Sequence, residues 1–293
     1  MFLKLKHTMD YYLVTTSHLE SATLFRENAD FIVGMNAVPL IAAYTGVVIV
    51  AFILMSNHVH FILYCTYSQA LDFINGYKKH YSFYLAKKYG IKETLRRNSV
   101  DIQKLDQSGE SLERAIAYVQ MNPVSANICL NPFDYPWGTG NCYFKVSTSK
   151  GIPIDNLSAR SRHALFHSRK EVPRGLLVGE SGFILPESYI QKGRVEAIFR
   201  SPNRMQYFLN SSSKAKIRLE SKDSETPSLK DTVVLPLMLD LCQKMFGKGL
   251  VNELTPEQLT ELLRQLRYRC SSNINQLARI TGLSYTQIAK LLE

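Results

Sequence analysis

The amino-acid sequence predicts an α+β protein: helices over one face of a small, mainly antiparallel sheet, followed by an all-α C-terminal unit. Three observations predict this class. Residues 46–55 and 58–65 are rich in β-branched and aromatic residues, and they are joined at Ser56 and Asn57, a tight-turn pair typical of a hairpin. Helical patterns come before and after this hairpin, an order that favours an α+β sandwich. Beyond residue 230 the apolar residues recur at helical spacing.

The remaining elements follow in chain order. A first strand is expected at 11–16, a helix at 26–43, a long helix at 67–89 ended by Gly90, and a helix from about 111 to 122. Residues 151–210 are basic, with a hairpin expected around 179–182 and helices on both sides of Pro202. We therefore divide the chain into four parts: an N-terminal domain at 1–150, a basic accessory region at 151–210, a linker at 211–230 that is poor in large apolar residues, and a helical domain at 231–293.

Composition restricts the partners. The formal net charge of +10 favours a polyanion such as nucleic acid. Five scattered cysteines without CxxC spacing suggest a reducing cytosol and no disulfide framework or zinc site, so we expect a cytoplasmic, nucleoid-associated protein. Residues 37–55 carry no charge and approach the length of a membrane span. Pro39 and the break at Tyr44, Thr45 and Gly46 instead predict a helix end, a turn and a central strand, and no membrane partner.

Two histidines flank one apolar residue within the second strand of the hairpin. Because side chains alternate along a strand, His58 and His60 point to one face and Val59 to the other. Two imidazoles on one rigid face can share a metal ion. The alternative is that both residues simply alternate on a solvated strand face, since an isolated His-x-His pattern is common.

The helix near 111–122 ends with a second candidate. Leu112, Ile116 and Val119 form its buried stripe, and Tyr118 lies at the border of that stripe. Asn122 follows one turn later on the same side, and the proline after it ends or bends the helix. The phenol of Tyr118 and the amide oxygen of Asn122 are thus expected side by side. The alternative is a half-buried tyrosine without a function, next to an ordinary helix end.

These motifs carry a resemblance to a known family. "SNHVHFIL" at 56–63, "YVQMNPV" at 118–124 and "YPWGTG" at 135–140 resemble, in this order, the REP-associated tyrosine transposases, which belong to the HUH single-strand endonucleases. The resemblance covers about residues 8–143. Ser56 stands where the family commonly has proline, and Val119 where it has isoleucine; neither change removes a reacting group.

The resemblance implies a ferredoxin-like sandwich for the N-terminal domain and assigns roles to four residues. His58, His60 and Asn122 would ligate a divalent metal, Mg²⁺ or Mn²⁺, and Tyr118 would be the nucleophile that forms a 5′-phosphotyrosine with DNA. Imidazole ligands favour manganese in principle, while cellular abundance favours magnesium. The implied partners are single-stranded hairpin DNA and its flanking duplex, bound by a monomer or homodimer.

Two further segments are candidate DNA-binding surfaces. The helix at 67–89 carries Tyr77, Tyr81 and Tyr84 with Lys78, Lys79, Lys87 and Lys88, which predicts base stacking and phosphate contacts, unless the aromatic residues are core. Residues 273–293 resemble a helix-turn-helix, with a turn at Gly282 and a cap at Ser284. There Tyr285, Thr286, Gln287 and Lys290 would face the major groove, unless the helices serve protein contacts. His80, His163 and His167 are expected to be surface residues rather than ligands.

The sequence thus predicts a DNA-processing enzyme and leaves two rivals. A DNA-binding regulator that keeps the fold but has lost catalysis would not need the intact His58, His60, Tyr118 and Asn122. A metal-dependent hydrolase that uses water would leave Tyr118 without a role.

Overall fold

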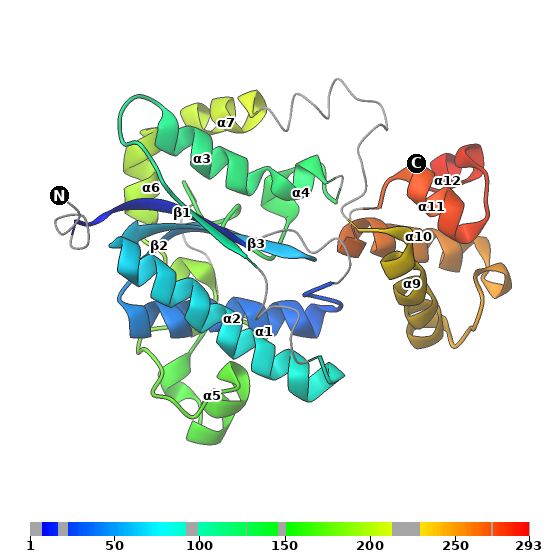
Figure 1. Cartoon of the computed structure of the whole chain (residues 1–293), viewed down its shortest axis with the longest axis horizontal. Coiled ribbons are helices and arrows are strands. Elements are labelled where there is room, and N and C mark those ends of the chain that lie inside the picture. Colours follow the sequence, from blue (N-terminus) through cyan, green and yellow to red (C-terminus); the bar gives the residue numbers. More distant parts are fainter. Residues whose placement is uncertain are drawn as a thin grey trace.

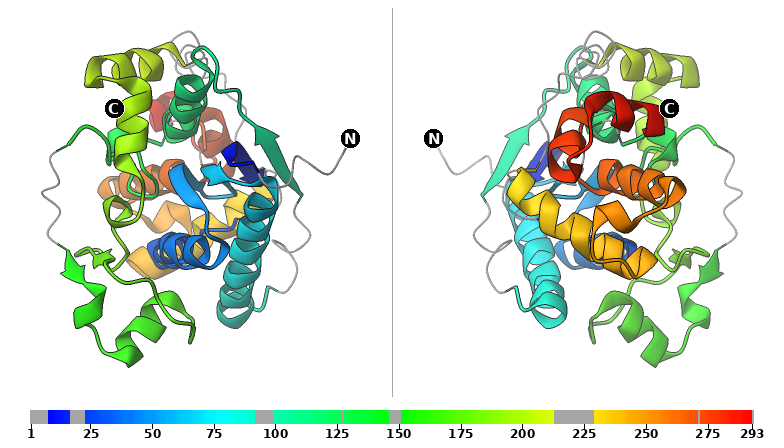
Figure 2. Two further views of the ribbon diagram at one scale, coloured as in Figure 1. Left: turned by 90° about the vertical axis from the view of Figure 1, so that its left-hand side faces the viewer. Right: turned by 90° about the vertical axis from the view of Figure 1, so that its right-hand side faces the viewer.

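A computed structural model describes residues 8–16, 23–91, 99–126, 128–145, 151–212, 229–270 and 272–292. It is an α+β structure, as predicted, with a four-stranded antiparallel sheet between helices and a group of helices beside one end of the sheet (Figures 1 and 2). None of the helices in the described parts is both long and apolar enough to cross a membrane.

The predicted hairpin forms two neighbouring strands of the sheet, one at its edge and one inside it. The strands of the sheet are β1 (Asp10–Thr16), β2 (Val48–Met55), β3 (His58–Cys65) and β4 (Val100–Lys104), in the order β2-β3-β1-β4. Each neighbouring pair is antiparallel, and Thr15 of β1 lies opposite His60 of β3. Because β3 is paired on both sides, its side chains are held at fixed positions.

The uncharged stretch at 37–55 divides into a helix, a turn and a strand as predicted, but the strand lies at the edge of the sheet and not at its centre. Helix α1 (Asn28–Thr45) ends at Gly46, whose φ of 69° places it in the left-handed region, and the Gly46 N–H donates to the Ala42 carbonyl over 2.9 Å. Strand β2 then begins at Val48. A glycine is favoured at this position because other residues adopt a positive φ only at a cost.

Helices cover both faces of the sheet, not one face as the sequence predicted (Figure 1). Phe61 of β3 contacts Tyr77 of α2 (Tyr67–Tyr89), with ring centroids 5.3 Å apart, on the face that α1 and α2 cover. His60, the adjacent residue, contacts Tyr118 of α3 (Ser111–Gln120) on the other face. The reason is burial: the β3 side chains are apolar or enclosed on both sides, so both faces need a covering layer.

The segment at 135–139, part of the "YPWGTG" motif, follows the outer edge of β2. The Leu54 N–H donates to the Trp137 carbonyl over 2.8 Å, and the Thr139 N–H donates to the Phe52 carbonyl over 3.1 Å. Gly138 allows this close approach, since a Cβ atom there would lie 2.7 Å from the Phe52 carbonyl oxygen. The motif therefore protects an edge strand from pairing with another chain.

Residues 151–212 are packed against the sheet domain and do not stand apart from it. Helices α6 (Lys192–Phe199) and α7 (Pro202–Ser211) lie on the α3 side, where Phe199 and Phe208 join the main core. The expected helices on both sides of Pro202 and the turn between Gly179 and Gly182 are confirmed. The short strands β5 (Ile152–Pro153) and β6 (Leu177–Val178) and helix α5 (Ala159–Phe166) lie on the α1 side.

The C-terminal helices enclose a hydrophobic core of their own, which includes Leu262, Leu266 and Leu277. The helices are α9 (Asp231–Phe246), α10 (Pro256–Cys270), α11 (Ile274–Thr281) and α12 (Tyr285–Leu292). Gly282 ends α11 with a φ of 74°, and Ser284 Oγ accepts from the Gln287 N–H over 3.3 Å at the start of α12. Most of the expected linker at 211–230, from 213 to 228, lies outside the described residues.

Candidate active site

The two histidines of β3 lie close together on the face that α3 covers. Their ring centroids are 4.8 Å apart with the ring planes at 88°. His58 is 3 % exposed and His60 is 2 % exposed, so the alternative of a solvated strand face is wrong. A strand that places two imidazoles in a buried position on one face can offer two ring nitrogens to a common ligand.

Each histidine ring is oriented by a hydrogen bond at Nδ1. His58 Nδ1 lies 2.8 Å from Asn57 Oδ1, and His60 Nδ1 lies 2.9 Å from Thr15 Oγ1 on β1. An amide oxygen can only accept, so His58 carries its proton on Nδ1 and, when the ring is neutral, its lone pair on Nε2. Metal-ligating histidines commonly have this kind of partner on the second nitrogen.

Sequence reasoning missed both partners of the histidines. Asn57 could have been found, because it precedes His58 directly. Thr15 could not, since it enters the site only through the pairing of β1 with β3. A threonine next to a histidine across two strands has no signal in the chain itself.

Tyr118 of α3 lies against His60. The two ring centroids are 5.7 Å apart and the planes stand at 85°. The tyrosine is half-buried, and this burial raises the pKa of its hydroxyl above the ordinary value. The hydroxyl is therefore neutral at pH 7 and becomes a nucleophile only when its proton is removed.

Asn122 lies at the break that the sequence predicted, although the break falls one residue earlier. Helix α3 ends at Gln120, and one further turn, α4 (Asn122–Ser125), begins after Met121. The Asn122 Nδ2 donates to the carbonyls of Tyr118, at 2.9 Å, and Val119, at 3.2 Å. These two bonds fix the amide, so its Oδ1 is turned away from the carbonyls of α3.

A salt bridge anchors the tyrosine helix to α7. Arg204 Nη2 lies 3.0 Å from Glu113 Oε1, and the Glu113 side chain is 8 % exposed. Arg204 also lies 3.6 Å from Glu110, which pairs with Arg114 at 2.7 Å. Sequence reasoning missed this anchor, because it depends on how residues 202–211 fold back onto α3.

Two neutral imidazoles can ligate a borderline divalent cation, which would take its other ligands from water or from substrate oxygens. In the described parts of the chain no cluster of three or more His, Cys, Asp or Glu side chains could hold a metal. The structure brings His58, His60 and Tyr118 together, while Asn122 lies one turn after Tyr118 and its part in a metal site stays a prediction. Mg²⁺ and Mn²⁺ complete a set of two imidazoles with water and phosphate oxygens, and the imidazoles favour manganese.

The expectation that Tyr77 and Tyr81 stack on DNA is wrong. Both rings are in the core, 1 % and 0 % exposed, and their hydroxyls donate to the carbonyls of Gly34 and Leu24. Lys78 is buried as well, and its desolvation lowers the pKa of its ammonium group. Their positions on α2 face the sheet and α1, which the helical spacing alone did not reveal; Lys79 is exposed.

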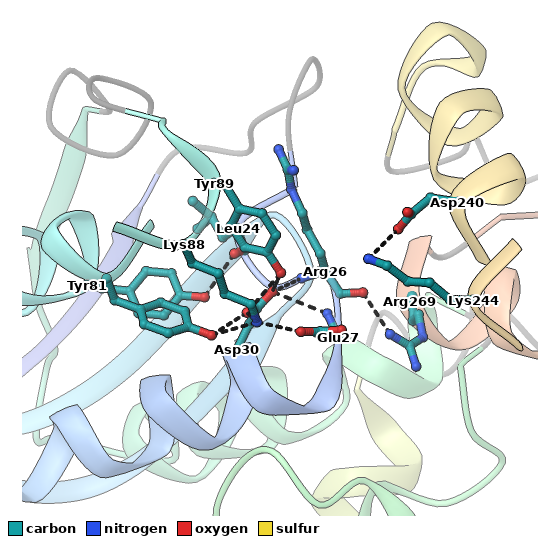
Figure 3. A network of polar contacts seen from close by, with 11 residues as sticks. Leu24, Arg26, Glu27, Asp30, Tyr81, Lys88, Tyr89, Asp240, Lys244 and Arg269 are labelled. Carbon is teal, nitrogen blue, oxygen red and sulfur yellow. Dashed lines mark hydrogen bonds and ion pairs between the residues drawn. The ribbon is translucent and has the colours of Figure 1, made fainter. Parts of the chain in front are cut away.

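Tyr84 and Lys88 both join a polar network around Asp30, and Figure 3 shows Lys88 beside this carboxylate. The Tyr84 hydroxyl and the Lys88 ammonium both donate to Asp30 Oδ1, each over 2.6 Å. Asp30 is fully buried at the start of α1. The charge of Lys88 is thus matched within the protein.

The four candidates on α12 are exposed. Tyr285, Thr286, Gln287 and Lys290 are all on the surface, while Ile288 faces the C-terminal core. Their contact with a DNA groove stays a prediction.

Comparisons with known proteins find one distant likeness. The sequence matches no protein-family model, and no curated protein is similar to it in sequence. Among solved structures, the chain is similar to a REP-associated tyrosine transposase bound to a REP hairpin. The two are 12 % identical, the match covers 46 % of this chain and 79 % of that chain, and the TM-score is 0.36. This indicates a distant structural relationship and assigns no role to any residue.

Proposed function

We propose that this protein is an HUH-type tyrosine transposase-like enzyme, a single-stranded DNA endonuclease and strand transferase that acts at hairpin or palindromic DNA. One observation carries the proposal. The ring centroid of Tyr118 lies 5.7 Å from that of His60, which lies 4.8 Å from that of His58. The tyrosine comes from α3, which is far from the two histidines in the sequence. A tyrosine becomes a nucleophile when a neighbouring base or metal helps to remove its proton, and the histidine pair places groups of this kind beside Tyr118.

The proposed reaction is a transesterification. The Tyr118 oxygen forms a bond with the scissile phosphorus, the bond from phosphorus to the 3′ oxygen breaks, and the phenol proton ends on that 3′ oxygen. The product is a 5′-phosphotyrosine and a free 3′-OH. Because the phosphotyrosine bond resembles the one that was broken, the reverse reaction rejoins DNA without ATP.

His58, His60 and Asn122 would hold Mg²⁺ or Mn²⁺, and the bound ion would polarise the scissile phosphate. Asn57 and Thr15 would keep both rings in the orientation that turns Nε2 toward the site. The protein also positions the nucleophile: the ion pair of Arg204 with Glu113 fixes α3, and α3 holds the Tyr118 phenol beside His60.

Two features of the architecture support this class. The order β1-α1-β2-β3-α2-β4, with strands arranged β2-β3-β1-β4, supports our proposal of a ferredoxin-like sandwich for this domain. In addition, α11 and α12 are joined by a short turn at Gly282, which suits a helix-turn-helix. We propose that exposed residues of α12, Tyr285 and Lys290 among them, contact the flanking duplex.

A covalent adduct separates this proposal from its rivals. The full chain is incubated with single-stranded hairpin DNA and Mn²⁺, and a protein–DNA band is sought on a denaturing gel. Tyr118→Phe should abolish the band and keep the fold, because only the attacking oxygen is lost. Tyr207→Phe is the matched control, since Tyr207 is 62 % exposed on α7, and it should form adduct at the normal level.

Two other outcomes would each identify a rival function, and a third would reject the tyrosine. Cleavage without an adduct would indicate a hydrolase that uses water. Binding with neither cleavage nor adduct would indicate a regulator. An adduct that survives Tyr118→Phe would reject this tyrosine as the nucleophile.

A further inference from the structure

A second site lies between α2 and α5, where the chain forms a groove of about 990 Å³. Helix α2 covers the face of the sheet opposite to Tyr118, and α5 lies beyond α1 on that same side (Figure 1). The groove is therefore separate from the candidate active site.

The groove is strongly cationic. Its lining includes Lys87 from α2, Arg160 from α5 and Arg169 after α5, all of them exposed. Among the residues that the structure describes, none that lines the groove is acidic. Two basic segments that lie far apart in the sequence thus meet at one surface, which attracts a polyanion.

Three histidines line the same groove. The sequence suggested that His80, His163 and His167 are isolated, but the structure brings them together. His167 adopts a φ of 47°, a left-handed conformation that is costly for any residue with a Cβ atom. Its ring centroid lies 5.3 Å from that of Tyr84, so a packing contact accompanies this conformation.

An exposed aromatic ring lies among these cations. Phe83 of α2 is 67 % exposed and lines the groove. The phenyl ring of Phe83 can stack on a planar ring of a ligand, and Lys87 and Arg160 in the same groove can bind a negative group attached to that ring. An unpaired nucleobase with its phosphate has this chemistry, whereas duplex DNA hides its base faces.

We propose that the groove between α2 and α5 binds single-stranded DNA, with phosphates on Lys87, Arg160 and Arg169 and a base on Phe83. The inference extends the proposed function, because it gives the enzyme a second contact with its substrate. It does not depend on cleavage, since Tyr118 lies on the other side of the sheet. A lipid surface fits less well, because Phe83 is the one large apolar side chain exposed among the described lining residues.

The histidines make the binding dependent on pH. Desolvation and the neighbouring His167 and Lys170 lower the pKa of His80, and desolvation with Lys87 and Lys88 lowers the pKa of His167. Both rings are therefore neutral at pH 7.5 and gain charge only under acid conditions. The affinity gain from these two rings should therefore begin only below the ordinary histidine pKa of about 6.5.

The test compares two charge-matched variants of the full chain. The groove variant is Lys87→Gln with Arg160→Gln and Arg169→Gln. The control is Arg200→Gln with Lys248→Gln and Arg264→Gln, three exposed cations outside the groove. Each variant loses three positive charges from exposed positions, so both should fold, and circular dichroism checks this.

Fluorescence anisotropy with labelled oligothymidine measures the result. The groove variant should bind at least about tenfold more weakly, and its salt slope should fall by about 2, since each phosphate contact to a single strand contributes about 0.7. The control should change affinity less than about threefold. Phe83→Ala should weaken binding by about five- to hundredfold, the range for loss of one base–aromatic stack.

Two results would overturn the inference: equal losses in the two triple variants, or unchanged affinity in Phe83→Ala. In the last case a base-free polyanion such as polyphosphate should compete as well as oligothymidine does. Failure here is distinct from failure of the proposed function. Tyr118→Phe should bind oligothymidine normally, and an adduct could form even if the groove binds nothing.

Discussion

Asp30 joins the start of α1 to the end of α2, and removing its carboxylate should destabilise the sheet domain (Figure 3). The carboxylate is fully buried and accepts hydrogen bonds from side chains and backbone alike. Lys88 Nζ lies 2.6 Å and the Tyr89 hydroxyl 2.9 Å from its oxygens, and the backbone N–H of Arg26 donates over 2.9 Å. Every one of these donors loses its acceptor in Asp30→Ala.

The size of the loss follows from burial. Removing one partner of a buried ion pair costs about 3–5 kcal/mol, because the other charge stays behind without compensation. Lys88 is 27 % exposed and keeps Glu27 as a second partner, so we expect the lower end, about 3 kcal/mol. Asp30→Asn keeps one acceptor oxygen and should cost about 1–3 kcal/mol.

Urea unfolding followed by tryptophan fluorescence measures this loss. Trp137 is the one tryptophan of the chain, and its ring lies 4.8 Å from Phe31, so it reports on the core next to Asp30. Asp72→Ala on the exposed side of α2 is the control and should change the free energy of unfolding by no more than about 0.5 kcal/mol. The reasoning is refuted if Asp30→Ala costs less than about 1 kcal/mol or no more than the control does.

Three further predictions concern the site, the sheet edge and alkaline pH. Thr15→Val removes the partner of His60 Nδ1 and should weaken Mn²⁺ binding by about 10- to 100-fold in calorimetry, with little change in thermal stability without metal; unchanged Mn²⁺ affinity would count against the ligand assignment. Gly138→Ala places a Cβ atom 2.7 Å from the Phe52 carbonyl oxygen and should cost about 1–3 kcal/mol in thermal unfolding, and an unchanged melting temperature would contradict this contact. Burial raises the pKa of Tyr89 to about 12, against about 10 when unfolded. The folded state therefore holds this proton more tightly, so stability should be level from pH 7 to 9 and fall between 10 and 12, and a level curve to pH 12 would exclude the effect.

The sequence predicts the fold where local patterns dominate. The hairpin, the break at Gly46 and the turn at Gly282 all depend on a few neighbouring residues, and each lies where it was expected. The two-sided covering of the sheet was missed, since it depends on α3 crossing to the face opposite α1 and α2, where α6 and α7 then pack beside it. Packing between segments that are far apart in the sequence leaves no periodic pattern from which it could be predicted.

The candidate site divides in the same way. The strand period places His58 and His60 on one face, and the family motif selects Tyr118, which the structure brings against His60. On α2 the same reasoning fails for Tyr77 and Tyr81, because a stripe of aromatic residues at helical spacing fits a core and a DNA surface equally well. Only the position of α1 against α2 decides between them.

The network around Asp30 also connects the C-terminal helices to the histidine strand. Arg269 of α10 donates to the Arg26 carbonyl over 2.7 Å (Figure 3). Two residues earlier, the Leu24 N–H donates to the Ser56 carbonyl over 2.7 Å, in the turn that leads into His58.

The segment from Leu24 to Glu27 is thus held from three sides, by Asp30, by α10 and by the hairpin turn. The α12 helix packs on the same C-terminal core as α10, so α12 and the turn before the histidines are connected through α10 and this segment. The C-terminal helices and the strand that carries His58 and His60 are therefore joined by hydrogen bonds as well as by covalent connection.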